Sequence, residues 1–263
     1  MLLEELISKS WYGTIGYIAK EEDLEALEQY ILYNLPILEK HQGVIVATNY
    51  GADLQQANTD LWKRYFPEII IIDNPTNRGH NHGYTDLDNL VVDYCKDNNI
   101  QWLCKSANDV IFNEEILLIE IPEADFYYLN GIGYGGMANY NFDFDRIIKE
   151  DFYPQTNYYF INLNKVDYLN NKSYLNSTYQ TIMSLENYNG RIWEYIPGWS
   201  CEGFLKECIE RNNLTTHHLI SEATYRKLLE VVQGCTIHDC SHKQIMVNGV
   251  CHFPYPDQPI ITL

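Results

Sequence analysis

Residues 69–110 read IIIIDNPTNRGHNHGYTDLDNLVVDYCKDNNIQWLCKSANDV, and this segment alternates between two kinds of pattern. It begins with a short β-branched run, residues 69–73, and continues through a polar segment with two glycines, residues 74–83. Apolar residues then recur at helical spacing over residues 84–98, and a second apolar run follows at residues 101–105. Strand, loop, helix and strand in this order are typical of a βαβ unit with parallel strands.

The same alternation covers the first 130 residues, so we expect four strands joined by three helices. The expected strands are residues 11–18, 44–49, 69–73 and 101–105, and the expected helices are residues 22–34, 53–66 and 84–98. Such a succession predicts an α/β fold in which helices flank a mostly parallel central sheet.

The second half of the chain differs from the first in composition. A fifth expected strand at residues 126–129 runs into a glycine-rich loop at residues 131–136, after which aromatic residues and asparagines become frequent. Further elements are expected at residues 158–163 (strand) and at residues 179–187, 202–212 and 222–233 (helices). Since no repeat or Pro-rich linker intervenes, we expect a single domain, with one half at residues 1–130 and a second half at residues 131–263 packed on the same sheet.

Composition limits the function. The formal net charge of −18 would repel phosphate backbones and anionic membrane surfaces, so nucleic acid is not an expected partner. No apolar run approaches the roughly 20 residues of a membrane-spanning helix. Residues 1–7 carry two early glutamates, where a secretory signal would have a positively charged end and a longer apolar stretch. Seven cysteines, an odd number, suit reduced thiols. We therefore expect a cytoplasmic globular protein without a transmembrane segment.

Polar segments follow the expected strands, and ligands of open α/β sheets bind beyond the carboxyl ends of strands. Asn49 follows the second strand, residues 74–83 follow the third, and residues 106–109 follow the fourth. Arg78 lies in the long loop that precedes a helix N-terminus, where it could hold a diphosphate through bidentate hydrogen bonds. The same composition also suits a surface turn that caps a helix.

The order of these motifs resembles the first half of glycosyltransferases with the GT-A fold, family 2-like members in particular. The resemblance rests on Asn77-Arg78-Gly79, Gly83, Asn89 and the segment from Trp102 to Val110, and it covers residues 11–165 by element order. It implies a GT-A-like, Rossmann-related fold with a smaller acceptor-side region after residue 130. It also implies a UDP- or GDP-sugar donor, with these expected contacts: Asn49, Asn77, Arg78, Asn108 and Asp109.

In that family an Asp-x-Asp or Asn-x-Asp element at a strand end holds a divalent metal and the donor diphosphate. Here Ala107 occupies the first acidic position, so Asn108 and Asp109 remain. One carboxylate and the diphosphate oxygens provide an incomplete coordination shell for Mn²⁺ or Mg²⁺, which prefer several oxygen ligands. A second ligand from elsewhere in the chain is therefore needed, or metal binding is weak or absent.

Residues 236–243, TIHDCSHK, are similar to the late His and Lys segment with which some GT-A enzymes complete the metal site. This likeness implies His238 as a metal ligand beside Asp109 and Lys243 as a diphosphate contact, with Asp239 as an alternative ligand. A zinc site is a competing interpretation that pools Cys235, His238, Cys240, His242, Cys251 and His252. The spacing lacks a Cys-x-x-Cys pair and does not favour zinc.

Residues 197–204 place Glu202 at the start of an expected helix, after an aromatic residue. Glu202 looks like the acid with which inverting GT-A enzymes deprotonate the acceptor hydroxyl. An N-terminal glutamate favoured by the helix dipole is the alternative. Tyr134 and Trp199 each lie beside a glycine in an expected loop, and they could stack on an acceptor sugar.

The preferred hypothesis is transfer of a hexose, with inversion, from a nucleotide-sugar to a hydroxyl group of a glycan or polysaccharide acceptor. A non-catalytic nucleotide- or carbohydrate-binding protein of the same fold is the second hypothesis, because Ala107 removes an acid. A nucleotidyltransferase is the third. That class carries a glycine-rich, basic signature after its first strand, which residues 17–22 lack.

Overall fold

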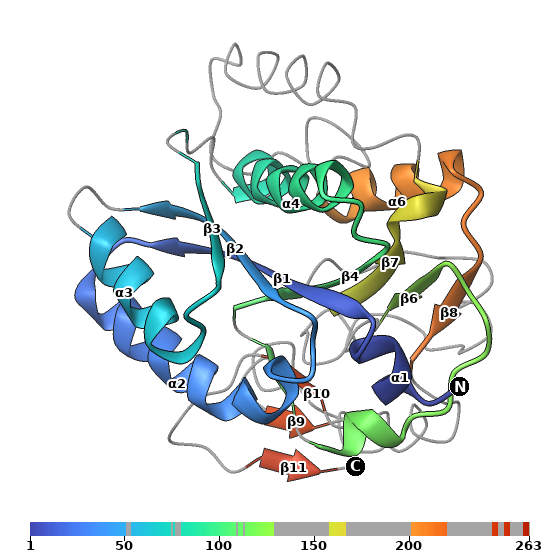
Figure 1. The fold of residues 1–263 in the computed structure, drawn as a ribbon, viewed down its shortest axis with the longest axis horizontal. Helices are drawn as coiled ribbons and strands as arrows, with labels where there is room; N and C mark the ends of the chain where they lie inside the picture. Colours follow the sequence, from blue (N-terminus) through green and yellow to red (C-terminus); the bar gives the residue numbers. More distant parts are fainter. Residues whose placement is uncertain are drawn as a thin grey trace, which may run out of the picture.

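In the computed structural model of the chain, the described residues are 1–50, 54–74, 76, 80–108, 110–112, 114–128, 158–166, 201–219, 244–246, 250–252 and 260–262. Seven of their strands form one sheet, and helices cover both of its faces (Figure 1). The expected α/β fold with a mostly parallel central sheet flanked by helices is therefore confirmed.

The central sheet has the strand order β3-β2-β1-β4-β7-β6-β8. Its members are β1 (Ser10–Ile18), β2 (Val44–Tyr50), β3 (Ile70–Asp73), β4 (Trp102–Ala107), β6 (Phe126–Tyr128), β7 (Tyr158–Asn162) and β8 (Thr216–His218). β7 is antiparallel to both β4 and β6, whereas every other neighbouring pair is parallel. Because β7 and β8 follow residue 131, both halves of the sequence contribute strands to this sheet.

The helices divide between two apolar clusters, one on each face of the sheet. The first face carries α1 (Leu3–Ile7), α2 (Glu21–Leu38) and α3 (Gln55–Tyr65), and the second carries α4 (His80–Asp97) and α6 (Cys201–Arg211) (Figure 1). The central strands are thus buried on both faces, which explains why β1, β2 and β4 read as nearly continuous apolar runs. None of the helices in the described part of the chain is long and apolar enough to cross a membrane.

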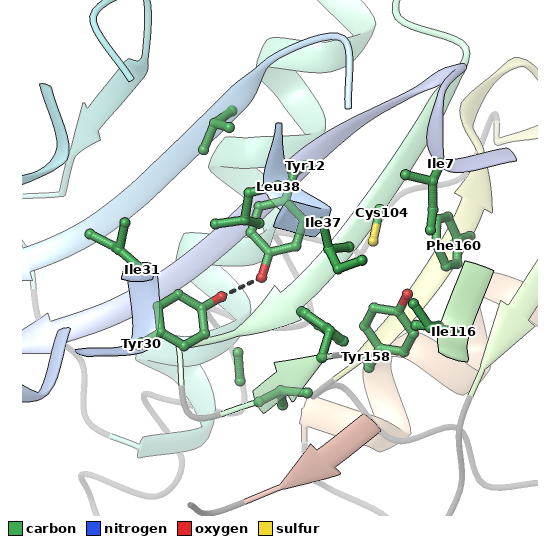
Figure 2. Close-up of a cluster of buried hydrophobic side chains, with 14 of the residues drawn as sticks. Ile7, Tyr12, Tyr30, Ile31, Ile37, Leu38, Cys104, Ile116, Tyr158 and Phe160 are labelled. Atoms are coloured by element: carbon green, nitrogen blue, oxygen red, sulfur yellow. Dashed lines mark hydrogen bonds between the residues drawn. The ribbon is translucent and has the colours of Figure 1, made fainter. Parts of the chain in front are cut away.

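The first cluster contains tyrosines whose hydroxyl groups must find partners inside the protein. Figure 2 shows the Tyr12 and Tyr30 hydroxyls turned toward each other, and they form a hydrogen bond between β1 and α2. Burial raises the pKa of Tyr12 well above its ordinary value, so the phenol stays protonated. Apolar side chains such as Ile37 and Leu38 pack around the pair. Buried hydroxyls that bond to each other avoid the free-energy penalty of unpaired polar groups.

Short elements extend the fold beyond the central sheet. β5 (Val110–Phe112) pairs antiparallel with β10 (Val250–His252), and β9 (Gln244–Met246) pairs parallel with β11 (Ile260–Thr262). Two 3₁₀ turns, η1 (Glu114–Leu118) and η4 (Leu163–Lys165), follow β5 and β7. The β5–β10 pair brings the end of the sequence to the strand that follows Asn108 and Asp109.

The helix expected at residues 22–34 is longer in the structure, where α2 continues through Pro36 to Leu38. Proline removes the hydrogen bond to the carbonyl of Leu32, four residues earlier. Leu32 is 51% exposed, so its carbonyl lies on the solvent side of the helix. Ile37 and Leu38 are buried and anchor the final turn, and this packing outweighs the proline.

Other boundaries also differ from the expectation. α4 begins at His80, so the two histidines of the expected loop belong to the first turn of a helix that continues through the buried Gly83. Asn49 lies inside β2, and residues 106–107 end β4, because backbone pairing with β1 continues to these positions. The loop expected at residues 131–136 and the helices expected at residues 179–187 and 222–233 lie outside the described residues.

Candidate functional site

The connections of the parallel strands change face between β1 and β4. From β1 the chain passes through α2 to β2 on the first face, whereas β4 is reached from β3 through α4 on the second. Ligands of open α/β sheets bind in the crevice beyond the carboxyl ends of the strands at such a switch point. We therefore define the candidate site by the residues at these strand ends: Gly16, Thr48, Asn49 and Asn108.

Gly16 and Asn108 are in close contact across this switch point. Register pairs Ile15 with Ala107, so Asn108 leaves β4 beside the last residues of β1. An ideal Cβ at Gly16 would lie 2.6 Å from Asn108 Nδ2 and 3.2 Å from its Cγ. The carboxamide of Asn108 thus lies directly over the β1 backbone, in space that any larger residue at position 16 would occupy.

Asn49 lies on the other side of β1, opposite Tyr17 in register. It is 4% exposed, and its Oδ1 has no hydrogen-bond partner among the residues that the structure describes. Its neighbour Thr48 is buried too, and Thr48 Oγ1 donates to the Gly16 carbonyl at 2.8 Å. A buried amide oxygen without a partner costs about 1–3 kcal/mol, which a bound donor group would recover.

Main-chain and side-chain hydrogen bonds hold the end of β3. Asn74 N–H donates to the Thr48 carbonyl at 3.0 Å, and Asn74 Oδ1 accepts the Thr76 N–H at 3.2 Å. Gln55 Nε2, at the start of α3, donates to Asp73 Oδ2 at 2.8 Å. These bonds fix where the chain leaves the sheet on its way to α4.

A buried cation lies on the second face of the sheet, two residues before the end of β4. Lys105 is fully buried, and its Nζ lies 3.2 Å from Asp88 Oδ1 on α4. Lys105 also donates to the Tyr84 hydroxyl and lies 4.0 Å from the centre of the Tyr84 ring. These contacts attach the first turns of α4 to β4. No role was predicted for Lys105 from the sequence, although a lysine inside an apolar strand pattern was the available signal.

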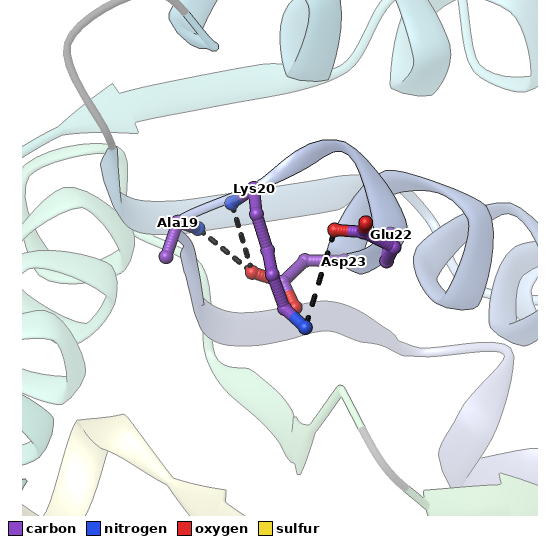
Figure 3. Close-up of polar contacts among 4 residues, drawn as sticks. All are labelled: Ala19, Lys20, Glu22 and Asp23. Carbon is purple, nitrogen blue, oxygen red and sulfur yellow. Dashed lines mark hydrogen bonds and ion pairs between the residues drawn. The ribbon is translucent and has the colours of Figure 1, made fainter.

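The turn from β1 to α2 is closed by Asp23. Figure 3 shows the Ala19 and Lys20 N–H groups donating to one carboxylate oxygen of Asp23, at 2.9 and 3.1 Å. Lys20 is the N-cap residue of α2 and Asp23 its third helical residue, so the Lys20 bond is the one that this residue makes in a capping box. Lys20 Nζ lies 4.0 Å from Glu22, and both of these side chains are exposed. Because a protein carboxylate takes these two amides, they do not serve as a phosphate-binding loop.

Glu202 lies in the first turn of α6, as the sequence predicted for this helix. α6 leads through a short turn to β8, which runs parallel to β6 and therefore starts at the amino edge of the parallel strands. α6 also packs against α4 on the second face (Figure 1). Its first turn accordingly points back toward the carboxyl edge, where the candidate site lies. The Glu202 side chain lies outside the described part of the structure.

Most of the other predicted site residues lie outside the described residues: Asn77, Arg78, Asp109, Tyr134, Trp199, His238 and Lys243. Their assigned roles stay predictions. Asn49 on β2 and Asn108 after β4 flank the end of β1, and their role in one shared site stays a prediction. For the zinc interpretation, Cys251 and His252 lie on β10, and the remaining four residues fall outside the described part.

No group of three His, Cys, Asp or Glu residues that could hold a metal ion occurs within the described part of the chain. Ala107, at the end of β4, is buried in the first apolar cluster and offers no donor atom. Its two sequence neighbours, Ser106 and Asn108, offer one hydroxyl oxygen and one amide oxygen. The described residues therefore do not fit a divalent metal by themselves.

Among the described side chains, Cys95, Cys104 and Cys208 are buried cysteines in the thiol form. Burial raises the pKa of the Cys95 thiol to about 12 and that of Cys208 to about 11. Burial raises the pKa of Cys104 as well. These thiols stay protonated near neutral pH, so they are core residues and not nucleophiles.

No protein-family profile and no curated protein matches the sequence. Among solved structures, a nucleoside-diphosphate-sugar pyrophosphorylase from Vibrio cholerae RC9 is 10% identical, with a TM-score of 0.41 over 78% of this chain and 90% of that chain. The mannosyltransferase PcManGT from Pyrobaculum calidifontis, in complex with GDP-Man and Mn²⁺, is 11% identical, with a TM-score of 0.34 over 48% of this chain and 36% of that chain. Neither likeness identifies a ligand or an activity for this chain.

Proposed function

We propose that the chain transfers a sugar from a UDP- or GDP-sugar to a hydroxyl group of a carbohydrate acceptor. The observation that carries this proposal is the pair of carboxamide side chains that flank the end of β1 at the switch point of the sheet. There the strand lies between Asn49 on β2 and Asn108 after β4, and Gly16 leaves the backbone open beneath the Asn108 carboxamide.

These groups suit the nucleoside part of a donor. Carboxamides both donate and accept hydrogen bonds, so they can pair with a base edge or with ribose hydroxyls. The buried Oδ1 of Asn49, unpartnered within the described residues, favours a ligand that donates an N–H or O–H. In a chain of net charge −18, a diphosphate needs local cations, and we assign this role to Arg78 and Lys243.

In the proposed reaction, the acceptor oxygen attacks the anomeric carbon of the donor sugar. The bond from that carbon to the diphosphate oxygen breaks, and the nucleoside diphosphate leaves on the opposite side, which inverts the anomeric centre. Glu202 accepts the hydroxyl proton, and its place in the first turn of α6 supports this role. Tyr134 and Trp199 would offer ring faces to the acceptor sugar.

A divalent cation would have Asp109 and His238 as its protein ligands in this proposal. Bound Mn²⁺ or Mg²⁺ would neutralise charge on the leaving diphosphate. Since the described residues do not form such a site, the roles of Glu202, Arg78 and Lys243 are proposed without it.

The first test is calorimetric titration of the protein with UDP and with GDP. We expect one nucleotide to bind, and Asn49→Leu to weaken this binding roughly tenfold because the buried partner of the nucleoside is lost. Asn162→Leu is the control. Asn162 is a buried asparagine that pairs with Trp102 at the opposite edge of the sheet, so its variant should bind as tightly as the wild type.

The second test separates glycosyl transfer from its alternatives. Incubation with UDP- or GDP-sugars and an acceptor panel should release nucleoside diphosphate. Release of pyrophosphate from a nucleoside triphosphate and a sugar 1-phosphate would instead identify a nucleotidyltransferase. The arrangement at Asp23, whose carboxylate takes the amides after β1, favours the first outcome. Tight nucleotide binding without turnover on any acceptor would identify a binding protein.

A further inference from the structure

Asn34 connects α2 to a strand far away in the sequence. Its Nδ2 donates to the Val110 carbonyl at 2.9 Å, and its Oδ1 accepts the Phe112 N–H at 2.7 Å. The side chain is fully buried, and the two bonds span 76 and 78 residues of sequence. One carboxamide thus satisfies two main-chain groups of β5.

On the edge of β5 that faces α2, the two hydrogen bonds of Asn34 take the place of those that a neighbouring strand would form. Residues i and i+2 of a strand turn their peptide groups to the same edge, so Val110 and Phe112 present theirs to α2. Ile111 presents its peptide group to the other edge, where register places Cys251 of β10. β5 is therefore held between a helix of the first half and a strand from the end of the chain.

The two hydrogen bonds of Asn34 hold the part of the chain that directly follows the candidate site. Asn108 is held over Gly16 on one side of the segment, and Val110 is fixed by Asn34 two residues later. Asp109 is the single residue between these two fixed points. We infer that Asn34 is a positioning residue, which fixes β5 directly after the candidate site so that Asn108 keeps its place over Gly16 and faces the donor. This inference rests on the proposed function.

A role in packing alone does not account for an amide at this position. Asn34 lies among apolar side chains of α2, including Ile31, Ile37 and Leu38, where leucine has the same branching at Cγ and would favour the helix more. Leucine would leave the Phe112 N–H and the Val110 carbonyl buried without partners. The amide group therefore satisfies main-chain groups of β5 and does not stabilise α2 itself.

The test compares Asn34→Leu with Leu27→Ala, a variant of a buried residue two turns earlier on the same helix. Leu27→Ala lowers stability without touching the bonds to β5, and Asn34→Ser provides a milder second variant. Unfolding midpoints, affinity for UDP or GDP, hydrogen exchange of the Phe112 amide and the NMR signal of the Asn108 side-chain amide are measured for each protein.

We expect both Asn34 variants to expose the Phe112 amide to exchange and to shift the Asn108 signal, and to weaken nucleotide binding roughly tenfold. Leu27→Ala should lower the midpoint while leaving the affinity and the Asn108 signal unchanged. If nucleotide affinity follows the midpoint equally in all variants, Asn34 is structural only. If the wild type binds no nucleotide, the proposed function fails, and the exchange and NMR data still decide whether Asn34 fixes β5 and the Asn108 side chain.

Discussion

Gly16 and Asn108 share one small space at the carboxyl end of β1, where a Cβ at position 16 would lie 2.6 Å from Asn108 Nδ2. The glycine is needed here for room beneath a side chain, because any Cβ would meet the carboxamide. The contact joins two strands whose connections pass on opposite faces of the sheet. A substitution at position 16 therefore changes the candidate site without entering the apolar core.

Gly16→Ala should displace the Asn108 side chain, which can rotate away at a small cost in stability. We expect weaker binding of UDP or GDP by calorimetry, with a change in unfolding free energy below about 1 kcal/mol. Gly13→Ala is the contrasting variant, because its Cβ would lie 2.6 Å from Val91 Cγ1 and 2.9 Å from Leu103 Cδ1 in the core. It should destabilise by roughly 1–3 kcal/mol and leave affinity unchanged. The reverse pattern would remove position 16 from the candidate site.

Much of the sheet could be predicted from periodicity. The strand expected at residues 11–18 is Ser10–Ile18, and the helix expected at residues 202–212 is Cys201–Arg211. Strands buried on both faces and amphipathic helices leave strong local signals, because burial of their apolar residues decides the structure. The polar ends of β2 and β4 were found in the same way, as the residues that follow apolar runs.

Asn34 and Lys105 could not be assigned in this way. Asn34 lies at a helical position, but its partners belong to β5, a strand of three residues with no periodicity of its own. Lys105 interrupts an apolar strand, and only the packing of α4 reveals Asp88 beside it. Contacts between residues far apart in sequence depend on how the elements pack, and a single sequence does not display them.

The buried Lys105–Asp88 pair should respond strongly to removal of one partner. Lys105→Met removes the ammonium beside the buried Asp88 carboxylate, and Asp88→Asn removes the carboxylate charge beside the buried ammonium, so each should lower the unfolding free energy by roughly 3–5 kcal/mol. The double variant should lose less than the sum of the two, as measured by urea unfolding. The exposed pair Arg64–Glu28, although shorter at 2.6 Å, provides the control. Arg64→Gln should change stability by at most about 1 kcal/mol. Additive losses at Lys105 and Asp88 would show that the two charges are not coupled.

His41 should make the protein sensitive to acid. Burial lowers the pKa of His41 from 6.5 to about 3, and Ser10 Oγ lies 2.9 Å from its Nδ1. Between these two pH values the unfolded chain binds a proton that the folded protein does not, so stability falls as the pH drops from 6.5 toward 3.

The measurement is urea unfolding of the wild type and of His41→Gln at several pH values between 7 and 4. The wild type should lose up to about 1.4 kcal/mol per pH unit more than the variant, which carries no titrating group at position 41. His217, whose pKa burial also lowers, is present in both proteins and cancels. Parallel pH profiles would show that His41 is protonated in the folded protein as well.

Ala107 allows a test of where a metal would bind. It ends β4, is buried, and occupies the position where the resemblance to GT-A enzymes places an acid. Without metal, Ala107→Asp should therefore lower the unfolding free energy by at least roughly 2 kcal/mol, because a carboxylate enters the apolar cluster. Ala107→Asn, which has nearly the same shape and no charge, is the matched control.

Added Mn²⁺ with UDP or GDP should then raise the thermal midpoint of Ala107→Asp more than that of Ala107→Asn. A metal that binds the native state stabilises it by mass action, and the new carboxylate supplies the oxygen ligand that residue 107 now lacks. For the wild type, Mn²⁺ should bind only when a nucleoside diphosphate is present, because Asp109 and His238 alone offer too few ligands. Equal shifts in the two variants, together with full wild-type turnover in chelator, would show that no metal reaches the end of β4. Arg78 and Lys243 alone would then have to stabilise the negative charge of the leaving nucleoside diphosphate.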